Sequence, residues 1–134
     1  MKNFIFRKIY FLFFMLYIFF PSCKDIINDP NIPDKDIPKT DVSFSKHIQP
    51  IFYARCATSG CHDDETRAGN YSMTTWSNVV QPGFVDPYLV ETSKIVWSIE
   101  GIGVEIMPPI SYGYLTSNQI DGVKAWIREG ARNN

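Results

Sequence analysis

Apolar and polar positions divide the chain into three parts. An uninterrupted apolar run, IYFLFFMLYIFF, extends from Ile9 to Phe20 and follows the basic residues Lys2, Arg7 and Lys8. The twelve residues of this run are fewer than the roughly 20 that a membrane-spanning helix needs, and they match the apolar core of a secretory signal. The pattern therefore predicts a signal peptide over residues 1–22.

The end of this segment resembles a bacterial lipoprotein signal, because a small residue, Ser22, precedes Cys23 and a polar stretch follows. The resemblance implies that Cys23 becomes the lipidated first residue of the mature protein and anchors it to a membrane. The alternative is a soluble secreted protein cleaved near Ser22, which would leave Cys23 as an unpaired thiol. With the anchor, the protein is expected in the cell envelope, facing the periplasm or the cell surface.

The stretch from Lys24 to Asp41 carries three prolines, charges of both signs and isolated isoleucines. It shows no helical or strand period, and it has too few apolar residues to form a core. We therefore expect residues 23–41 to form a flexible tether stiffened by its prolines. Residues 42–134 are then long enough for one small domain.

Helical spacing of apolar residues begins at the start of that domain. Ile48, Ile51 and Phe52 lie on one face of a short helix. This helix is expected to begin near Pro50, because proline is excluded from a helix interior. Two further short helices are expected over residues 74–80 and 91–101.

The stretch TSNQIDGVKAWIREGA predicts the clearest helix. Thr116 and Gln119 have the spacing of a capping box, and an apolar face follows at helical intervals, formed by Ile120, Val123, Trp126 and Ile127. No strand pattern accompanies these helices. The fold class is therefore predicted to be all-α, with three to five short helices and long loops.

The net charge of the chain bears on which classes of molecule it could bind. The whole chain has a formal net charge of −1, and removal of residues 1–22 takes away three basic residues and no acidic one, which leaves −4. A mildly acidic domain without a basic stripe is not expected to bind nucleic acid. Export also places Cys56 and Cys61 in an oxidising compartment, where free thiols rarely persist.

The stretch CATSGCH admits three chemistries. A disulfide between Cys56 and Cys61 is possible, but it gives His62 no role. A structural zinc site needs about four nitrogen or sulfur ligands, and His47 or Asp63 would have to complete it. The third is a covalent haem, because c-type haem sites read C-x-x-C-H. Here four residues separate the cysteines, and small side chains with a glycine let the longer loop bulge.

A covalent haem needs either an axial ligand on the face opposite the histidine or a deliberately vacant position there. Met107 meets this need, since it lies 45 residues after His62 on a loop that Pro108 and Pro109 stiffen. Met73 and His47 are rival ligands. Methionine also commonly fills gaps in a core.

Together these features resemble a small single-haem class I cytochrome c domain, from about Val42 to Ala131. The similarity rests on IQPIFYARC before the site, CATSGCH itself, YSMTTWSNVV after it, MPP as the ligand loop and LTSNQIDGVKAWIREGA at the end. In that family the C-terminal helix packs across the helix before the haem site. Trp126 and Ile127 would make this contact here.

The resemblance implies a cytochrome c-like fold around one haem c, attached through Cys56 and Cys61, with His62 and Met107 as axial ligands of the iron. The implied function is one-electron transfer with redox protein partners, rather than catalysis, because both faces of the iron are occupied. If Met107 does not ligate the iron, a haem-based sensor or peroxidase is the alternative. A haem-free, disulfide-bonded accessory lipoprotein is another.

The acidic residues Asp63, Asp64 and Glu65 follow the histidine directly. Such a cluster could steer a basic redox partner towards the site. The alternative is an ordinary solvated loop.

Overall fold

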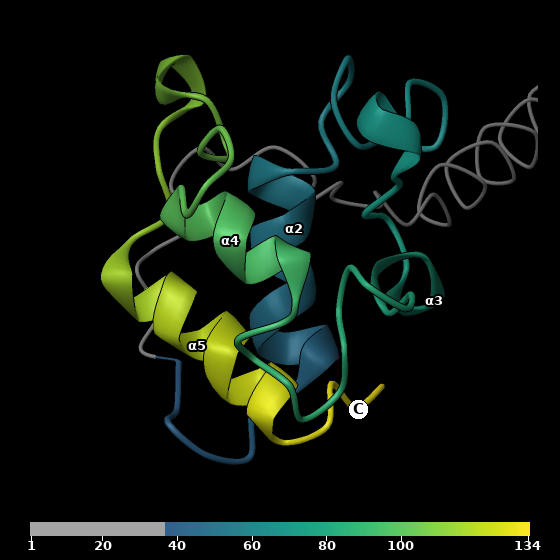
Figure 1. The fold of residues 1–134 in the computed structure, drawn as a ribbon. Coiled ribbons are helices and arrows are strands. Elements are labelled where there is room, and N and C mark those ends of the chain that lie inside the picture. The colour runs from purple at the N-terminus through teal and green to yellow at the C-terminus, as the bar shows by residue number, and fades with distance from the viewer. Residues whose placement is uncertain (1–36) are drawn as a thin grey trace, which may run out of the picture.

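The computed structural model describes residues 37–134, which are drawn in colour in Figure 1. The predicted signal peptide, Cys23 and most of the predicted tether lie outside these residues. The described part contains helices and no strand, which confirms the predicted all-α class. Within it, no helix has the length and the apolar character needed to cross a bilayer.

The helical segments are short and are separated by long loops. In chain order they are a π-helical turn η1 (Phe44–Ile48), helix α2 (Gln49–Arg55), a 3₁₀ turn η2 (Ala68–Asn70), helix α3 (Trp76–Val79), helix α4 (Lys94–Glu100), a 3₁₀ turn η3 (Ile110–Tyr112) and helix α5 (Ser117–Arg128).

Helix α2 carries the chain into the cysteine motif. It contains Pro50 in its first turn, where the missing N–H has no helical partner to lose. Ile48, Ile51 and Phe52 are buried, so the predicted apolar face is confirmed. The π-helical turn directly before α2 was not predicted from the sequence.

Local caps set the bounds of α4 and α5. Helix α4 follows Ser93 and ends at Gly101, whose φ of 68° is left-handed, a conformation that glycine adopts without a steric penalty. Helix α5 begins after a complete capping box between Thr116 and Gln119, as predicted. Lys124 of α5 forms an ion pair with Glu100 of α4 (2.8 Å), which joins the two helices.

The centre of the core is an aromatic cluster around Trp126. Its ring centroid lies 5.4 Å from that of Phe44 and 6.4 Å from that of Phe52, and its indole N–H donates to the Arg132 carbonyl (2.9 Å). Helix α5 therefore packs against η1 and α2, as Figure 1 shows. The contact expected between Trp126 and the helix before the cysteines is confirmed.

The packed chain begins upstream of the predicted boundary at Val42. Ile37 is only 9% exposed, and its N–H donates to Asn118 Oδ1 (3.2 Å). Its side chain occupies the space over Gly122 of α5, where an added Cβ would come within 2.7 Å of Ile37 Cγ2. Ile37, which was expected to belong to the tether, therefore packs against the domain, whereas the side chains of residues 38–41 are exposed.

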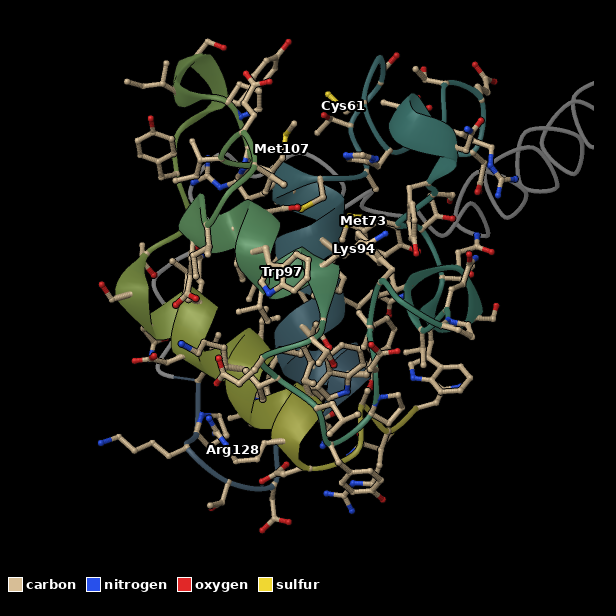
Figure 2. All side chains as sticks on the ribbon, in the orientation of Figure 1. Cys61, Met73, Lys94, Trp97, Met107 and Arg128 are labelled. Atoms are coloured by element: carbon tan, nitrogen blue, oxygen red, sulfur yellow. The ribbon has the colours of Figure 1, made fainter. Side chains whose placement is uncertain are left out.

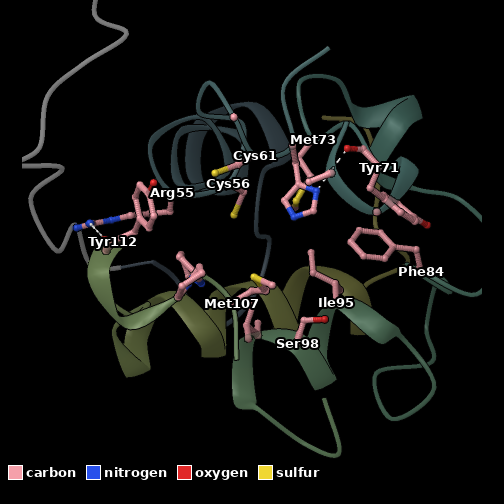
Figure 3. A pocket seen from close by; sticks show the side chains of 17 residues that line it. Arg55, Cys56, Cys61, Tyr71, Met73, Phe84, Ile95, Ser98, Met107 and Tyr112 are labelled. Atoms are coloured by element: carbon pink, nitrogen blue, oxygen red, sulfur yellow. Dashed lines mark hydrogen bonds between the residues drawn. The ribbon is translucent and has the colours of Figure 1, made fainter. Parts of the chain in front are cut away.

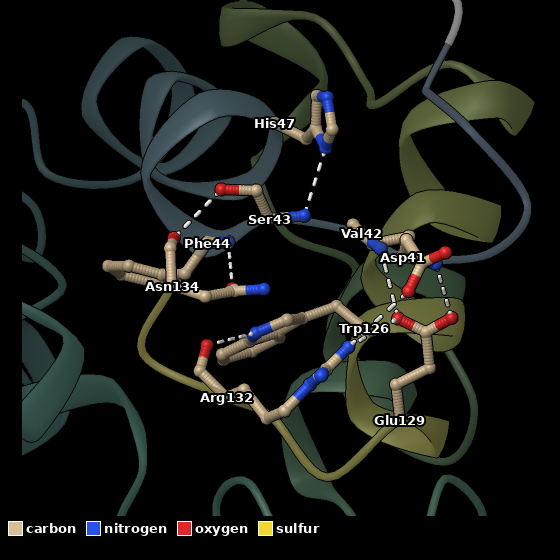
Figure 4. Close-up of polar contacts among 9 residues, drawn as sticks. All are labelled: Asp41, Val42, Ser43, Phe44, His47, Trp126, Glu129, Arg132 and Asn134. Carbon is tan, nitrogen blue, oxygen red and sulfur yellow. Dashed lines mark hydrogen bonds and ion pairs between the residues drawn. The ribbon is translucent and has the colours of Figure 1, made fainter.

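Residues near the C-terminus accept hydrogen bonds from the first residues of the domain (Figure 4). Glu129 accepts the backbone N–H groups of Asp41 (2.7 Å) and Val42 (2.9 Å) through its carboxylate. Asn134 accepts the N–H of Ser45 through its main-chain oxygen and that of Phe44 through Oδ1, each at 2.9 Å. The N–H groups at the start of the first helical turn, which have no helical partner, thus find acceptors at the other end of the domain.

Candidate cofactor-binding site

A cavity of about 400 Å³ lies between two walls of the domain (Figure 3). One wall is the end of α2 with the loop that follows it, and the other is α4 with the loop around Met107. The volume is within the range of roughly 300–1,000 Å³ that is usual for small-molecule and cofactor sites. Cys56, Cys61, His62 and Met107, the four residues predicted for the haem site, all line this cavity.

The four-residue spacer folds into a turn that keeps the two cysteines together. The Cys61 N–H donates to the Thr58 carbonyl (3.0 Å), and the His62 N–H donates to the Cys56 carbonyl (3.1 Å). Gly60 has a φ of 83°, a left-handed conformation that favours glycine, and its N–H donates to Thr66 Oγ1 (3.2 Å). The four residues between the cysteines therefore form a tight, hydrogen-bonded turn.

Both cysteines are free and line the cavity, and Figure 3 shows the Cys56 sulfur pointing towards the wall that carries Met107. Cys56 is buried and Cys61 is half-buried. The pKa of the Cys56 thiol is raised to about 12, mainly by burial and also by the nearby Cys61, while the charge of Arg55 partly opposes the rise. Cys56 is therefore a thiol rather than a thiolate at neutral pH.

His62 is held by the segment that follows η2. Its Nδ1 lies 3.4 Å from the Tyr71 carbonyl, and its own carbonyl accepts the Met73 N–H (2.8 Å). Because a carbonyl can only accept, the Nδ1 contact is a hydrogen bond when Nδ1 carries the proton. In that tautomer the lone pair is on Nε2, which can then bind a metal.

Met107 lies on the wall opposite the cysteines (Figure 3). Its backbone N–H donates to the carbonyl of Ser98 in α4 (2.8 Å). Pro108 and Pro109 follow and also line the cavity. The thioether is therefore presented from a loop fixed to α4 at its base.

The two rival ligands have different positions. Met73 is 4% exposed and lines the cavity, but its backbone bond to His62 places it on the histidine wall. Figure 2 shows Cys61 and Met107 near one end of the domain, Met73 closer to its middle and Arg128 near the other end. His47 does not line the cavity, and its Nδ1 accepts the Ser43 N–H (3.0 Å).

A zinc site at the motif was the other metal hypothesis. Within residues 37–134, no three or more His, Cys, Asp and Glu side chains are grouped closely enough to hold a metal ion. Neither His47 nor Asp63 lines the cavity with the two cysteines. The described residues therefore do not form the four-ligand zinc site.

Aromatic and aliphatic side chains form most of the remaining lining. Tyr71 packs on Phe84 with ring centroids 3.7 Å apart, and burial, with a contribution from the charge of Asp86, raises the pKa of Tyr71. Ile95 and Ile99 of α4 face the same space. The lining of the cavity is thus mainly apolar.

Arg55 is the one permanently charged side chain among the described residues that line the cavity. Its Nη1 donates to the Tyr112 carbonyl (3.2 Å), which joins α2 to the loop after Met107. Arg55, Phe84 and Ser98 were not predicted from the sequence as site residues. The position of Arg55 directly before the motif was a signal for it, whereas Phe84 reaches the cavity only through the tertiary fold.

The acidic residues after His62 are joined to neighbouring loops. Asp63 accepts the Thr66 N–H (2.6 Å), and this backbone hydrogen bond is the main cause that lowers the pKa of Asp63. Asp64 accepts the Ser72 hydroxyl (2.6 Å), and hydrogen bonds from Ser72 and Thr74 lower the pKa of Asp64. Both carboxylates therefore have partners within the domain.

The arrangement provides two thiols and an imidazole on one wall, a thioether on the other and an apolar space between them. Such a set can hold a flat apolar group that carries a metal between nitrogen and sulfur donors. Comparison of the chain with protein-family models, curated proteins and solved structures found no significant match.

Proposed function

We propose that this protein is a single-haem c-type cytochrome that transfers single electrons in the cell envelope. The observation that carries the proposal is the convergence of Cys56, Cys61, His62 and Met107 on one cavity. Met107 is 45 residues from His62 in the sequence, so the local motif does not explain its place there. A disulfide or a core methionine would not require this juxtaposition.

The residues present fit haem c. Cys56 and Cys61 would hold it through thioether bonds, and His62 and Met107 would bind its iron from the two walls. When bound, haem supplies a one-electron couple, whose potential methionine ligation tends to raise. Around a bound haem, the mainly apolar lining would lower the local dielectric, which is a second means by which a protein sets that potential.

The protein's own backbone would hold both axial ligands. The Tyr71 carbonyl oxygen lies 3.4 Å from Nδ1 of His62 and would favour the tautomer with its proton on Nδ1, which would keep Nε2 available. The Ser98 carbonyl holds the backbone of Met107 at 2.8 Å. Since both faces of the iron would be occupied, we propose an electron carrier rather than an enzyme.

The helix order also supports a cytochrome c-like fold. Helix α5 packs through Trp126 on η1 and α2, next to the attachment motif. We further propose a signal peptide over residues 1–22 and a lipid anchor at Cys23. The redox partners would then be proteins of the envelope, and the acidic charge of the mature chain argues against nucleic acid as a ligand.

The proposal is tested by expressing the full chain in a host that attaches haem c and by staining a denaturing gel for haem. Covalent haem stays with the chain on denaturation, so a stained band at the mature size is expected in the membrane fraction. Replacement of both Cys56 and Cys61 by Ala should abolish the stain. The matched control is Cys23→Ala, which should keep the stain and move the protein out of the membrane fraction.

A second pair of variants identifies the sulfur ligand. Met107→Ala should keep the stain but convert the low-spin spectrum to a high-spin one, whereas Met73→Leu should leave it low-spin. A high-spin spectrum in the unaltered protein would favour the sensor or peroxidase alternative. A well-expressed mature chain without stain would refute the cytochrome and leave the disulfide-bonded accessory lipoprotein.

A further inference from the structure

The loop after His62 is joined to residues 72–78 by a polar network around one carboxylate. Asp64 Oδ1 accepts the hydroxyl of Ser72 (2.6 Å), and both oxygens of Asp64 accept from Thr74 Oγ1 (2.9 Å each). The Asn78 amide donates to Ser72 Oγ (3.2 Å) and, at 3.5 Å, to Asp64 Oδ1. The Asp64 carboxylate thus accepts hydrogen bonds from three residues, Ser72, Thr74 and Asn78.

Ser72 is the central member of this network, because its neighbours on both sides contact His62. The carbonyl of Tyr71 lies 3.4 Å from Nδ1 of the imidazole. The N–H of Met73 donates to the His62 carbonyl (2.8 Å). Ser72 itself is only 1% exposed, so its hydroxyl has to be satisfied within the protein.

We infer that Asp64 is a positioning residue for the axial histidine: through Ser72, it fixes the Tyr71 carbonyl against His62 Nδ1. This inference rests on the proposed function, in which His62 binds the haem iron. The neighbouring Asp63 provides a contrast, because its carboxylate accepts the Thr66 N–H within its own turn. Although Asp63 and Asp64 are adjacent, their carboxylates therefore have different structural roles.

The expected consequence follows from how a partner on Nδ1 acts on a metal-bound imidazole. A carbonyl that accepts from Nδ1–H makes the ring a stronger donor and fixes its orientation. A stronger donor stabilises the ferric iron and lowers the reduction potential. Loosening the Tyr71 carbonyl should therefore raise the potential of the haem.

The test compares reduction potentials of haem-loaded, full-length protein in detergent, for Asp64→Asn, Asp63→Asn and Ser72→Ala. Asp64→Asn and Asp63→Asn remove the same charge from adjacent positions, so a difference between them is not a general charge effect. Ser72→Ala changes no charge and breaks the link to Asp64. We expect Asp64→Asn and Ser72→Ala to raise the potential, with Asp63→Asn shifting it less than either does.

The exchange rate of the His62 Nδ1 proton, followed by NMR in the reduced protein, provides a second readout. We expect faster exchange in Asp64→Asn and Ser72→Ala than in Asp63→Asn. If Asp64→Asn yields no stained protein, Ser72→Ala alone decides.

Equal shifts in the two aspartate variants, or an unchanged potential and exchange rate in Ser72→Ala, would overturn this inference and leave the cytochrome intact. Absence of stain in the unaltered chain would overturn both proposals together. The haem stain therefore separates the failure of one from the failure of the other.

Discussion

The contact between Ile37 and Gly122 gives a prediction whose size can be worked out from the structure. A Cβ added at Gly122 would lie 2.7 Å from Ile37 Cγ2 and 2.8 Å from Ile37 Cδ1, so the isoleucine has to move. In a free helix, Gly→Ala would stabilise by about 1 kcal/mol. Here the gain is opposed by overpacking, which typically costs about 1–3 kcal/mol.

We therefore expect Gly122→Ala to lower the free energy of unfolding by about 1 kcal/mol, and Ile37→Ala to lower it by about 2 kcal/mol, the low end for a buried isoleucine. In the Ile37→Ala background the two side-chain atoms nearest to the added Cβ, Cγ2 and Cδ1 of residue 37, are absent. The remaining contact, 3.2 Å to the Cβ of residue 37, is relieved by a small shift. Gly122→Ala should then stabilise by about 0.5–1 kcal/mol.

The assay is urea unfolding of the four proteins of this double-mutant cycle, followed by tryptophan fluorescence, in exported protein with Cys23→Ser. The change of sign between the two backgrounds is the diagnostic result. Asp121→Ala, on the exposed side of α5, is the matched control and should change stability little. If Gly122→Ala stabilises both backgrounds equally, Ile37 does not pack on α5 and residues 37–41 belong to the tether.

Three further predictions follow from other contacts. Trp126→Ala should cost about 3–5 kcal/mol in the same urea assay, and a loss below about 1 kcal/mol would contradict its central place in the core. Glu129→Ala leaves the N–H groups of residues 41 and 42 without their acceptor and should cost about 1–3 kcal/mol, whereas Glu129→Gln should recover part of this. In folded haem-free chain at pH 8, iodoacetamide should alkylate Cys61 faster than Cys56, because burial raises the pKa of Cys56 to about 12 and leaves little thiolate. Peptide mass spectrometry would measure the alkylation rate of each cysteine. The two rates should be equal in urea, where the chain is unfolded. Equal rates in buffer would refute the prediction.

Features that depend on neighbouring residues were predictable from the sequence. The capping box of α5 joins positions three apart, and Gly101 ends α4 by its own backbone preference. Met107 was identified by the proline-rich loop that carries it, together with the family resemblance. These signals need little knowledge of the tertiary fold.

Features made by distant parts of the chain were not predictable in this way. Ile37 looked like an isolated apolar residue in a tether, because its partner Gly122 has no side chain to mark the contact. The partners of Asp64 lie eight to fourteen positions away on an irregular loop, where no periodicity relates them. Phe84 likewise reaches the cavity only because its loop folds back onto Tyr71.

The hydrogen bonds between the two ends of the domain also set an order of events during folding. Ser43 and Asn134 are 91 positions apart, and contacts of such long range form late because the chain must first close a large loop. Until residue 134 has emerged, the first helical turn lacks these acceptors. Cys56 and Cys61 lie between the two ends and are accessible during this interval. After closure Cys56 is buried and lines the cavity. If the proposed haem is to bond to both sulfurs, the Cys56 thiol is therefore more accessible before the two ends of the domain meet than afterwards.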